Sequence, residues 1–214
     1  VENKAGGGGS VGATETARAT PDGYALGMAT VSTTAANPAI NPKTPYNPLT
    51  DFSPIINIAA TPNIIAVNPS FPAKDYKSFV AELKKSPGKY SYSSSGTGGI
   101  GHLQMELYKN LSGTFVTHIP YRGTAPAVTD LLGGQVDLFI TTPASVVQQV
   151  KAGKLKALAV TSASRLAALP QVPTAVEAGL KGFNLDSWFA LYGPAGLPAD
   201  VVQTLSAEIG KLLA

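Results

Sequence analysis

Hydrophobic and polar positions along the chain follow two periods, which separate the segments expected to be helices from those expected to be strands. The clearest helical period is Tyr76, Phe79, Val80 and Leu83, at i, i+3, i+4 and i+7. Short apolar or β-branched runs bounded by Gly and Pro predict strands instead. The predicted strands are residues 24–30, 55–60, 63–68, 90–93, 115–121, 136–141, 155–161 and 188–192, and residues 1–3 are expected to end a further strand.

Capping and stop signals set the limits of the other predicted helices. Thr124 is expected to cap a helix that ends before Gly133-Gly134, and Thr174 with Glu177 forms the capping-box pattern of a short helix. Five prolines between residues 33 and 54 predict a loop with one short helical turn. The remaining predicted helices are residues 11–19, 100–111, 145–151 and 198–213.

The alternation of strands and helices predicts an α/β protein with open, mostly parallel sheets and helices on their faces. The predicted strands are enough for two modest sheets, and residues 55–68 could carry the chain from one lobe to the other. With 214 residues, 44% of them hydrophobic, the chain can bury a real core. We therefore expect two α/β lobes.

Charge and composition exclude several classes of protein. The net charge is +3, and no run of basic residues exceeds Lys84-Lys85, so a nucleic-acid partner is not expected. The sequence has no cysteine, no apolar stretch long enough to span a membrane and no recognisable metal or P-loop motif. The first residues, VENKAGGGG, do not resemble a signal peptide, and we expect the chain to begin within a domain.

The stretch SSSGTGGIGHL places Gly96, Gly98 and Gly101 in the spacing G-x-G-x-x-G, between a predicted strand and a predicted helix. Three interpretations are open. A dinucleotide site also needs an acidic residue after the next strand, where this chain has only Arg122. An anion site needs only backbone N–H groups at a helix start. The glycines could also serve only close packing of strand and helix.

Hydroxyl side chains follow three of the predicted strands. They occur at residues 30–34, at Ser93, Ser94, Ser95 and Thr97, and at Thr141-Thr142. Because ligands of open α/β sheets bind outside the carboxyl ends of strands, these clusters could meet at one cleft. Hydroxyls without acids or bases favour binding over catalysis.

Catalytic patterns are weak in this sequence. Ser94, His102 and Asp130 could be imagined as a triad, but no G-x-S-x-G elbow is present. His102, in the first turn after the glycine loop, could donate to a bound carboxylate, whereas His118 in a strand is more typical of a structural residue. We expect no enzyme, no catalytic residue, no metal and no cofactor.

Several blocks together are similar to a known family. They are VENKAGGGGSVGA, PDGYALGMAT, NPLTDFSPI, SSGTGGIGHL, IPYRGTAPAVTDLLGGQVDLFI, KAGKLKALAVTSASR, LPQVPTAVEAGL and WFALYGPAGLP. In this order they resemble the tripartite tricarboxylate transporter substrate-binding proteins, also called the Bordetella uptake gene family. The resemblance implies a periplasmic solute-binding protein of type II fold, whose two lobes close on a small organic carboxylate and deliver it to the membrane subunits of the transporter. We also expect a monomer.

The resemblance also implies ligand contacts. In the first lobe they are in the loop at residues 30–33, and in the second lobe they follow three strands. The implied binding residues are Thr30, Ser32, Thr33, Ser94, Ser95, Thr97, Gly98, Gly99, His102, Arg122, Gly123, Thr124, Thr141 and Thr142.

The chain departs from the family pattern at both ends. Members usually begin with a signal peptide, a first strand, a glycine-containing loop and a helix, whereas this chain is expected to start at the second strand and to stop early. It is therefore interpreted as a fragment with an incomplete first lobe. We expect residues 1–63 and 193–214 to form that lobe and residues 64–192 the second.

Two other functions are left open by the residues themselves. One is the effector-binding module of a transcription regulator, which would need a helix-turn-helix segment upstream. The other is an NADP-dependent enzyme, based on G-x-G-x-x-G and Arg122.

Overall fold

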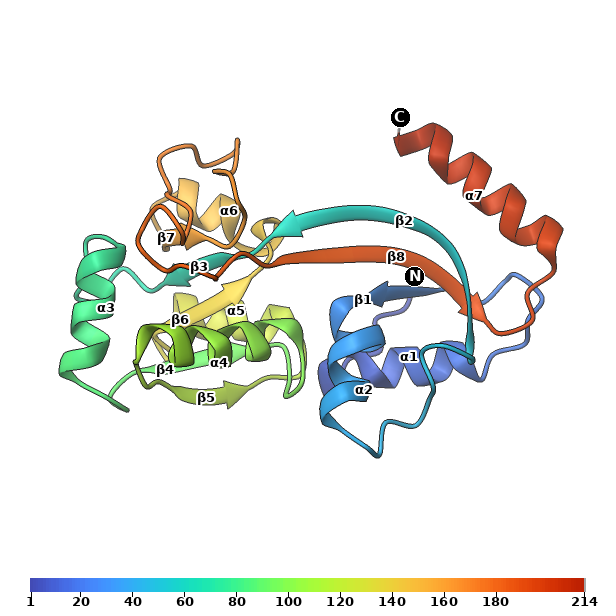
Figure 1. Cartoon of the computed structure of the whole chain (residues 1–214), viewed down its shortest axis with the longest axis horizontal. Coiled ribbons are helices and arrows are strands. Elements are labelled where there is room, and N and C mark those ends of the chain that lie inside the picture. Colours follow the sequence, from blue (N-terminus) through green and yellow to red (C-terminus); the bar gives the residue numbers. More distant parts are fainter. Residues whose placement is uncertain (214) are drawn as a thin grey trace. The chain divides into compact units, whose positions relative to one another are not determined.

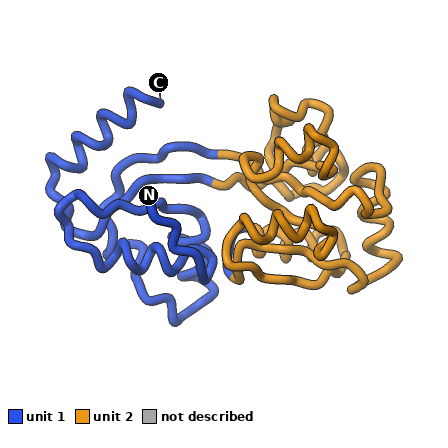
Figure 2. Tube along the Cα trace, turned by 180° about the vertical axis from the view of Figure 1, so that it is seen from behind, with its two compact units in different colours: residues 1–60, 98–100, 188–214 blue, residues 61–97, 101–187 orange. Residues whose placement is uncertain are grey.

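The computed structural model describes residues 1–213, which form two compact units (Figures 1 and 2). Of the described residues, unit 1 contains 1–60, 98–100 and 188–213, and unit 2 contains 61–97 and 101–187. Apart from the short insertion of residues 98–100, the chain passes from one unit to the other at two points, and both lie inside strands. They are 60/61 in β2 (Phe52–Pro62) and 187/188 in β8 (Asp186–Pro194). The lobe boundaries expected from the sequence, at 63/64 and 192/193, stay predictions.

Unit 2 is built on a five-stranded sheet with the order β5-β4-β6-β3-β7 among the described residues. The strands are β3 (Ile64–Val67), β4 (Ser91–Ser94), β5 (Thr117–Pro120), β6 (Leu138–Thr141) and β7 (Lys156–Val160). The β4 strand is parallel to both β5 and β6, whereas β3 is antiparallel to both β6 and β7. Four strands therefore run one way and β3 runs the other.

The sheet is mostly parallel, as expected, and β3 is its one reversed strand among the described residues. The strands β4, β5, β6 and β7 are each reached through a helix, which returns the chain to the same edge. By contrast, β3 follows β2 after the single residue Asn63. Asn63 is buried, its N–H donates to Thr161 Oγ1, and its side chain donates to Gln104 Oε1 and Ser187 Oγ. These bonds hold the break between β2 and β3.

Helices cover both faces of this sheet. One face carries Ile65, Tyr92 and Leu138 and packs against α3 (Tyr76–Lys85) and α4 (Ile100–Ser112). The other carries Ile64 and Phe139 and packs against α5 (Thr124–Leu132) and α6 (Pro143–Lys151). Alternate residues of a strand face opposite ways, so β3 and β6, in which every residue is buried, supply both cores.

Unit 1 has a three-stranded sheet with the order β1-β8-β2, in which β1 (Gly27–Thr30) is antiparallel to β8. Its helical segments are a 3₁₀ turn (Gly7–Gly9), α1 (Ser10–Ala17), a π-helical segment η2 (Ser32–Ala36), α2 (Asn37–Ile40) and α7 (Ala199–Leu213). The Phe52 and Tyr192 rings pack together with their centroids 4.3 Å apart. None of residues 199–213 is buried.

Several local predictions were wrong. Residues 1–3 form no strand, and β2 runs through Thr61-Pro62 as one strand of 11 residues, because proline is tolerated where its missing N–H costs no ladder bond. The N-cap of α5 is Gly123 and Thr124 is its first residue. Thr174 and Glu177 do exchange the two capping-box hydrogen bonds, but a turn follows in place of a helix.

Candidate functional site

Three loops of unit 2 lie at one edge of its sheet. The strands β4, β5 and β6 are adjacent and parallel, so their carboxyl ends meet at the same edge. Each strand leads there into a loop and then a helix, α4, α5 and α6 respectively. The structure thus brings the predicted residues of unit 2 to a single edge. These are Ser94, Ser95, Thr97, His102, Arg122, Gly123, Thr124, Thr141 and Thr142.

Helix starts make this edge electropositive without acidic side chains. The first N–H groups of a helix have no partner within it, and the helix dipole adds partial positive charge. The N-cap residues, Thr142 of α6 and Gly123 of α5, accept no side-chain hydrogen bond from the first backbone N–H groups of their helices, and the Thr142 hydroxyl lies 3.3 Å from Ser145 Oγ. Arg122 is exposed, Thr97 is exposed, and Thr141 is buried at the end of β6. The arrangement suits a small anion.

The glycine-rich loop follows β4, and its backbone conformation and packing account for the glycines in it. Gly96 and Gly98 have φ of 142° and 82°, values that favour glycine. Gly101 has an ordinary helical backbone, but a Cβ there would lie 2.7 Å from the carbonyl oxygen of Ile140 on β6. Close packing of α4 on the sheet therefore requires this glycine. The G-x-G-x-x-G spacing thus has a packing cause whether or not the loop binds a ligand.

Ser94, expected to contact the ligand, lies inside the protein. It is fully buried, and its Oγ lies 2.6 Å from His118 Nε2. The same Oγ donates to the Gly96 carbonyl and accepts from the Gly96 N–H, both at 3.2 Å. The hydroxyl is therefore engaged inside the protein.

The two histidines are stacked on each other. His102 of α4 and His118 of β5 have ring centroids 4.3 Å apart, and Tyr92 lies on the other side of His118 at 4.7 Å. Burial, reinforced by His102, lowers the pKa of His118 from 6.5 to about 4. Burial also lowers the pKa of His102, although Glu106 opposes the shift. The imidazoles are neutral near pH 7.

The predicted loop of unit 1 is tied together by its own hydroxyls. The Thr30 N–H donates to Thr33 Oγ1 at 3.0 Å, and the Thr33 N–H donates back to Thr30 Oγ1 at 3.2 Å. Thr33 is buried, and its carbonyl accepts from the Tyr46 hydroxyl at 2.7 Å. Ser32 Oγ accepts the N–H of Ile100 at 2.8 Å. These hydroxyls shape the loop.

Two glycine-rich loops of unit 1 meet on the segment that follows β1. Residues 98–100 belong to this unit, and a Cβ on Gly98 would lie 2.6 Å from Asn37 Oδ1. The buried Asn37 side chain also donates to the carbonyls of Gly7 and Gly8 at 3.1 and 3.2 Å. Gly99, between Gly98 and Ile100 in the chain, is also buried.

Sequence reasoning missed this role of Asn37 and of residues 6–9. The signal was present, because four consecutive glycines precede a helix here, as glycines also do in the later loop. All four have positive φ, and a Cβ on Gly9 would lie 2.9 Å from Thr33 Cγ2. We add this loop to the candidate site of unit 1.

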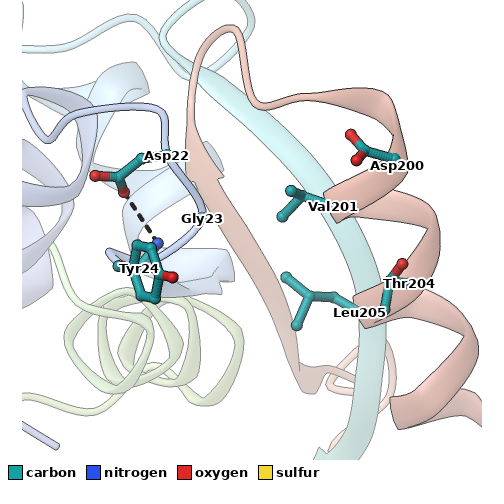
Figure 3. A pocket seen from close by; sticks show the side chains of 7 residues that line it. All are labelled: Asp22, Gly23, Tyr24, Asp200, Val201, Thr204 and Leu205. Atoms are coloured by element: carbon teal, nitrogen blue, oxygen red, sulfur yellow. Dashed lines mark hydrogen bonds between the residues drawn. The ribbon is translucent and has the colours of Figure 1, made fainter.

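A hollow of about 290 Å³ in unit 1 lies elsewhere (Figure 3). It is lined by Asp22, Gly23 and Tyr24 and by Asp200, Val201, Thr204 and Leu205 of α7. No predicted site residue lines it. Two carboxylates on its wall repel an anion, so the hollow is no candidate for carboxylate binding.

Residues 1–213 contain no cluster of three His, Cys, Asp or Glu side chains that could hold a metal ion. In the same part of the chain, none of the helices combines the length and the apolar character needed to cross a membrane.

A two-unit α/β protein whose loops and helix starts suit an anion defines a solute-binding class, and comparison with known proteins agrees. The model of the TctC family, described as the tripartite tricarboxylate transporter family receptor, matches residues 1–213. This chain belongs to that family. A UPF0065 protein of Agrobacterium vitis is 38% identical over the whole chain. The match places the chain with transporter receptors and supports neither a transcription regulator nor an NADP-dependent enzyme.

Solved structures share the fold. One described as a periplasmic transporter is 50% identical with a TM-score of 0.96, covering all of this chain and 71% of its own. An R. palustris protein with adipate is 34% identical with a TM-score of 0.94, covering 97% of this chain and 70% of its own. MatC of Rhodopseudomonas palustris with bound malate is 32% identical with a TM-score of 0.91, covering 96% and 70%.

The chain is shorter than its relatives. It spans 61% of the A. vitis protein and 64% and 66% of the next two curated relatives.

Proposed function

We propose that this protein binds a small organic carboxylate, a dicarboxylate or tricarboxylate, and delivers it to the membrane subunits of a tripartite transporter. The observation that carries the proposal is the family match over residues 1–213. Relatives with TM-scores of 0.94 and 0.91 are described with adipate and with malate, which are both dicarboxylates.

The chemistry of unit 2 supports an acidic ligand. The predicted residues at its sheet edge include hydroxyls, glycines, His102 and Arg122 but no Asp or Glu. Backbone N–H groups at helix starts bind carboxylates through their dipoles and do not need a fixed counter-ion. Bridging water would let one such edge accept acids of different length.

We further propose that the protein works outside the cytoplasm and as a monomer. A relative that is 50% identical is described as a periplasmic transporter. The ligand contacts that the resemblance assigns to each unit stay a prediction, and so does the incompleteness of the first lobe.

Calorimetric titration of the full chain tests the proposal. Malate and adipate serve as probes, and 1,6-hexanediol is the matched control because it has the carbon chain of adipate without its charges. We expect saturable binding of at least one acid and none of the diol. Failure of both acids to bind, or equal binding of the diol, would overturn the proposal.

A variant pair locates the site. Thr142→Val removes a hydroxyl at the proposed edge and is expected to weaken binding by roughly 2- to 10-fold, the usual worth of one hydrogen bond. Thr129→Val removes a hydroxyl that bonds within α5 to the Ala125 carbonyl and should leave the affinity unchanged. Equal affinities for both variants would place the site elsewhere.

A further inference from the structure

The stacked rings of Tyr92, His118 and His102 are joined to the glycine-rich loop by the hydrogen bond between His118 Nε2 and Ser94 Oγ. His118 and Tyr92 are paired in register on adjacent parallel strands, so their side chains share a face of the sheet, and Ser94 is on that face too. The His118 ring is fixed between Tyr92 and His102, and its Nε2 meets the Ser94 hydroxyl. A buried strand serine and a stacked histidine thus form one unit.

Tyr92, at one end of this ring stack, is fixed by a hydrogen bond to Glu106. The Tyr92 hydroxyl donates to Glu106 Oε1 at 2.7 Å, and Lys109 Nζ donates to both oxygens of the same carboxylate at 2.7 and 2.8 Å. Burial opposes ionisation of Glu106, but these bonds prevail and lower its pKa. The groups around His118 are therefore the Tyr92 phenol, the His102 imidazole and the ionised Glu106 carboxylate, whose charge is balanced by Lys109.

The hydroxyl of Ser94 is used completely. A serine hydroxyl has one proton to donate and two lone pairs to accept. Donation to the Gly96 carbonyl and acceptance from the Gly96 N–H leave one lone pair. All three contacts are satisfied together when His118 carries its proton on Nε2 and donates it to Ser94.

Backbone bonds tie the same turn on its other side. The Tyr121 N–H donates to the Ser94 carbonyl at 2.9 Å, and the Gly123 N–H donates to the Ser95 carbonyl at 3.2 Å. The His118 side chain reaches this turn through the Ser94 hydroxyl, which is bonded to both the carbonyl and the N–H of Gly96, a glycine with φ of 142°.

We propose that His118 is a positioning residue, which through Ser94 holds the first turn of the glycine-rich loop in its anion-binding conformation. The ligand part of this inference rests on the proposed carboxylate function. His118 itself does not touch the ligand.

Two substitutions separate stacking from hydrogen bonding. His118→Phe keeps a flat ring between Tyr92 and His102 but removes the donor to Ser94. His118→Gln loses the ring but keeps an amide N–H at similar reach. In the full chain without ligand, hydrogen exchange of residues 95–97 is expected to be about tenfold faster in His118→Phe, which corresponds to ~1.4 kcal/mol. His118→Gln should restore most of the protection.

A double-mutant cycle that combines His118→Phe with Ser94→Ala tests whether His118 acts on the loop through Ser94. If His118 acts through Ser94, the double variant exchanges no faster than Ser94→Ala alone. Ser112→Ala is the control, because it removes another buried hydroxyl bonded to the Tyr108 carbonyl at the far end of α4. It should lower the melting temperature and leave exchange at residues 95–97 unchanged.

The outcomes separate this inference from the proposed function. If malate and adipate fail to bind but His118→Phe loosens the loop and His118→Gln restores it, carboxylate binding is refuted and the positioning role stands. If wild type binds malate, His118→Phe should bind it about tenfold more weakly. Unchanged loop exchange in His118→Phe, additive effects in the cycle, or equal loosening by Ser112→Ala overturns the inference.

Discussion

The two units of this protein are stabilised in different ways. Unit 2 has a buried sheet with an apolar core on each face, and its strands β3 and β6 contribute to both cores. Unit 1 has a three-stranded sheet, α7 without a buried residue, and a loop cluster held by Asn37 and threonine hydroxyls. The difference shows that dense apolar packing holds the sheet of unit 2, while polar bonds to backbone atoms shape the candidate loops of unit 1.

The largest expected effect comes from the core of unit 2. Leu131→Ala removes a fully buried side chain and should lower the free energy of unfolding by roughly 2–5 kcal/mol. Leu132→Ala, one residue along α5, is 36% exposed and should cost about 0.5 kcal/mol or less. Urea denaturation followed by circular dichroism measures both. Similar losses for the two variants would contradict the assignment of the core.

Two glycine substitutions, one in α4 of unit 2 and one in α7 of unit 1, compare how closely these helices pack. Gly101→Ala should cost roughly 1–3 kcal/mol, because its Cβ would meet the Ile140 carbonyl at 2.7 Å. Gly210→Ala lies within α7, where the nearest atom is Ile56 Cδ1 at 3.9 Å, and should gain about 0.5–1 kcal/mol from helix propensity. The same denaturation experiment checks the opposite signs, and a gain at Gly101 would show that α4 packs less closely than described.

The smallest expected effect is a pH dependence confined to unit 2. The folded pKa of His118 is about 4 and that of His102 is lowered, so the unfolded chain binds more protons between about pH 6.5 and 4. Stability is therefore complete above about pH 6.5 and falls as the pH drops toward 4. Melting temperatures at about pH 7 and about pH 5 measure the loss.

The control for this pH dependence is His118→Gln, which has no titrating ring. Its melting temperature should fall less between the two pH values than that of wild type. An equal fall would assign the pH dependence to other groups. Unit 1 contains neither histidine, which is why the effect is expected only in unit 2.

Local patterns determined much of the fold and part of the candidate site. Helical periodicity located α3, and glycine and proline signals located most connections because they act within a few residues. The order of strands and helices suggested that hydroxyl clusters after three strands could meet at one cleft. The structure places those that follow β4 and β6 at one edge of the unit 2 sheet, while residues 30–34 belong to unit 1. The family was identifiable from blocks spread over nearly the whole chain, and the match over residues 1–213 confirms it.

Only the tertiary structure decided the rest, because it depends on pairs of residues far apart in the chain. The reversal of β3 follows from its direct link to β2, which continues through Thr61 and ends at Pro62. Ser94, expected at the ligand, is bonded instead to a histidine 24 residues away, and Asn37 holds a glycine loop about 30 residues upstream. Such contacts are set by which strands and loops become neighbours, and no local pattern encodes that choice.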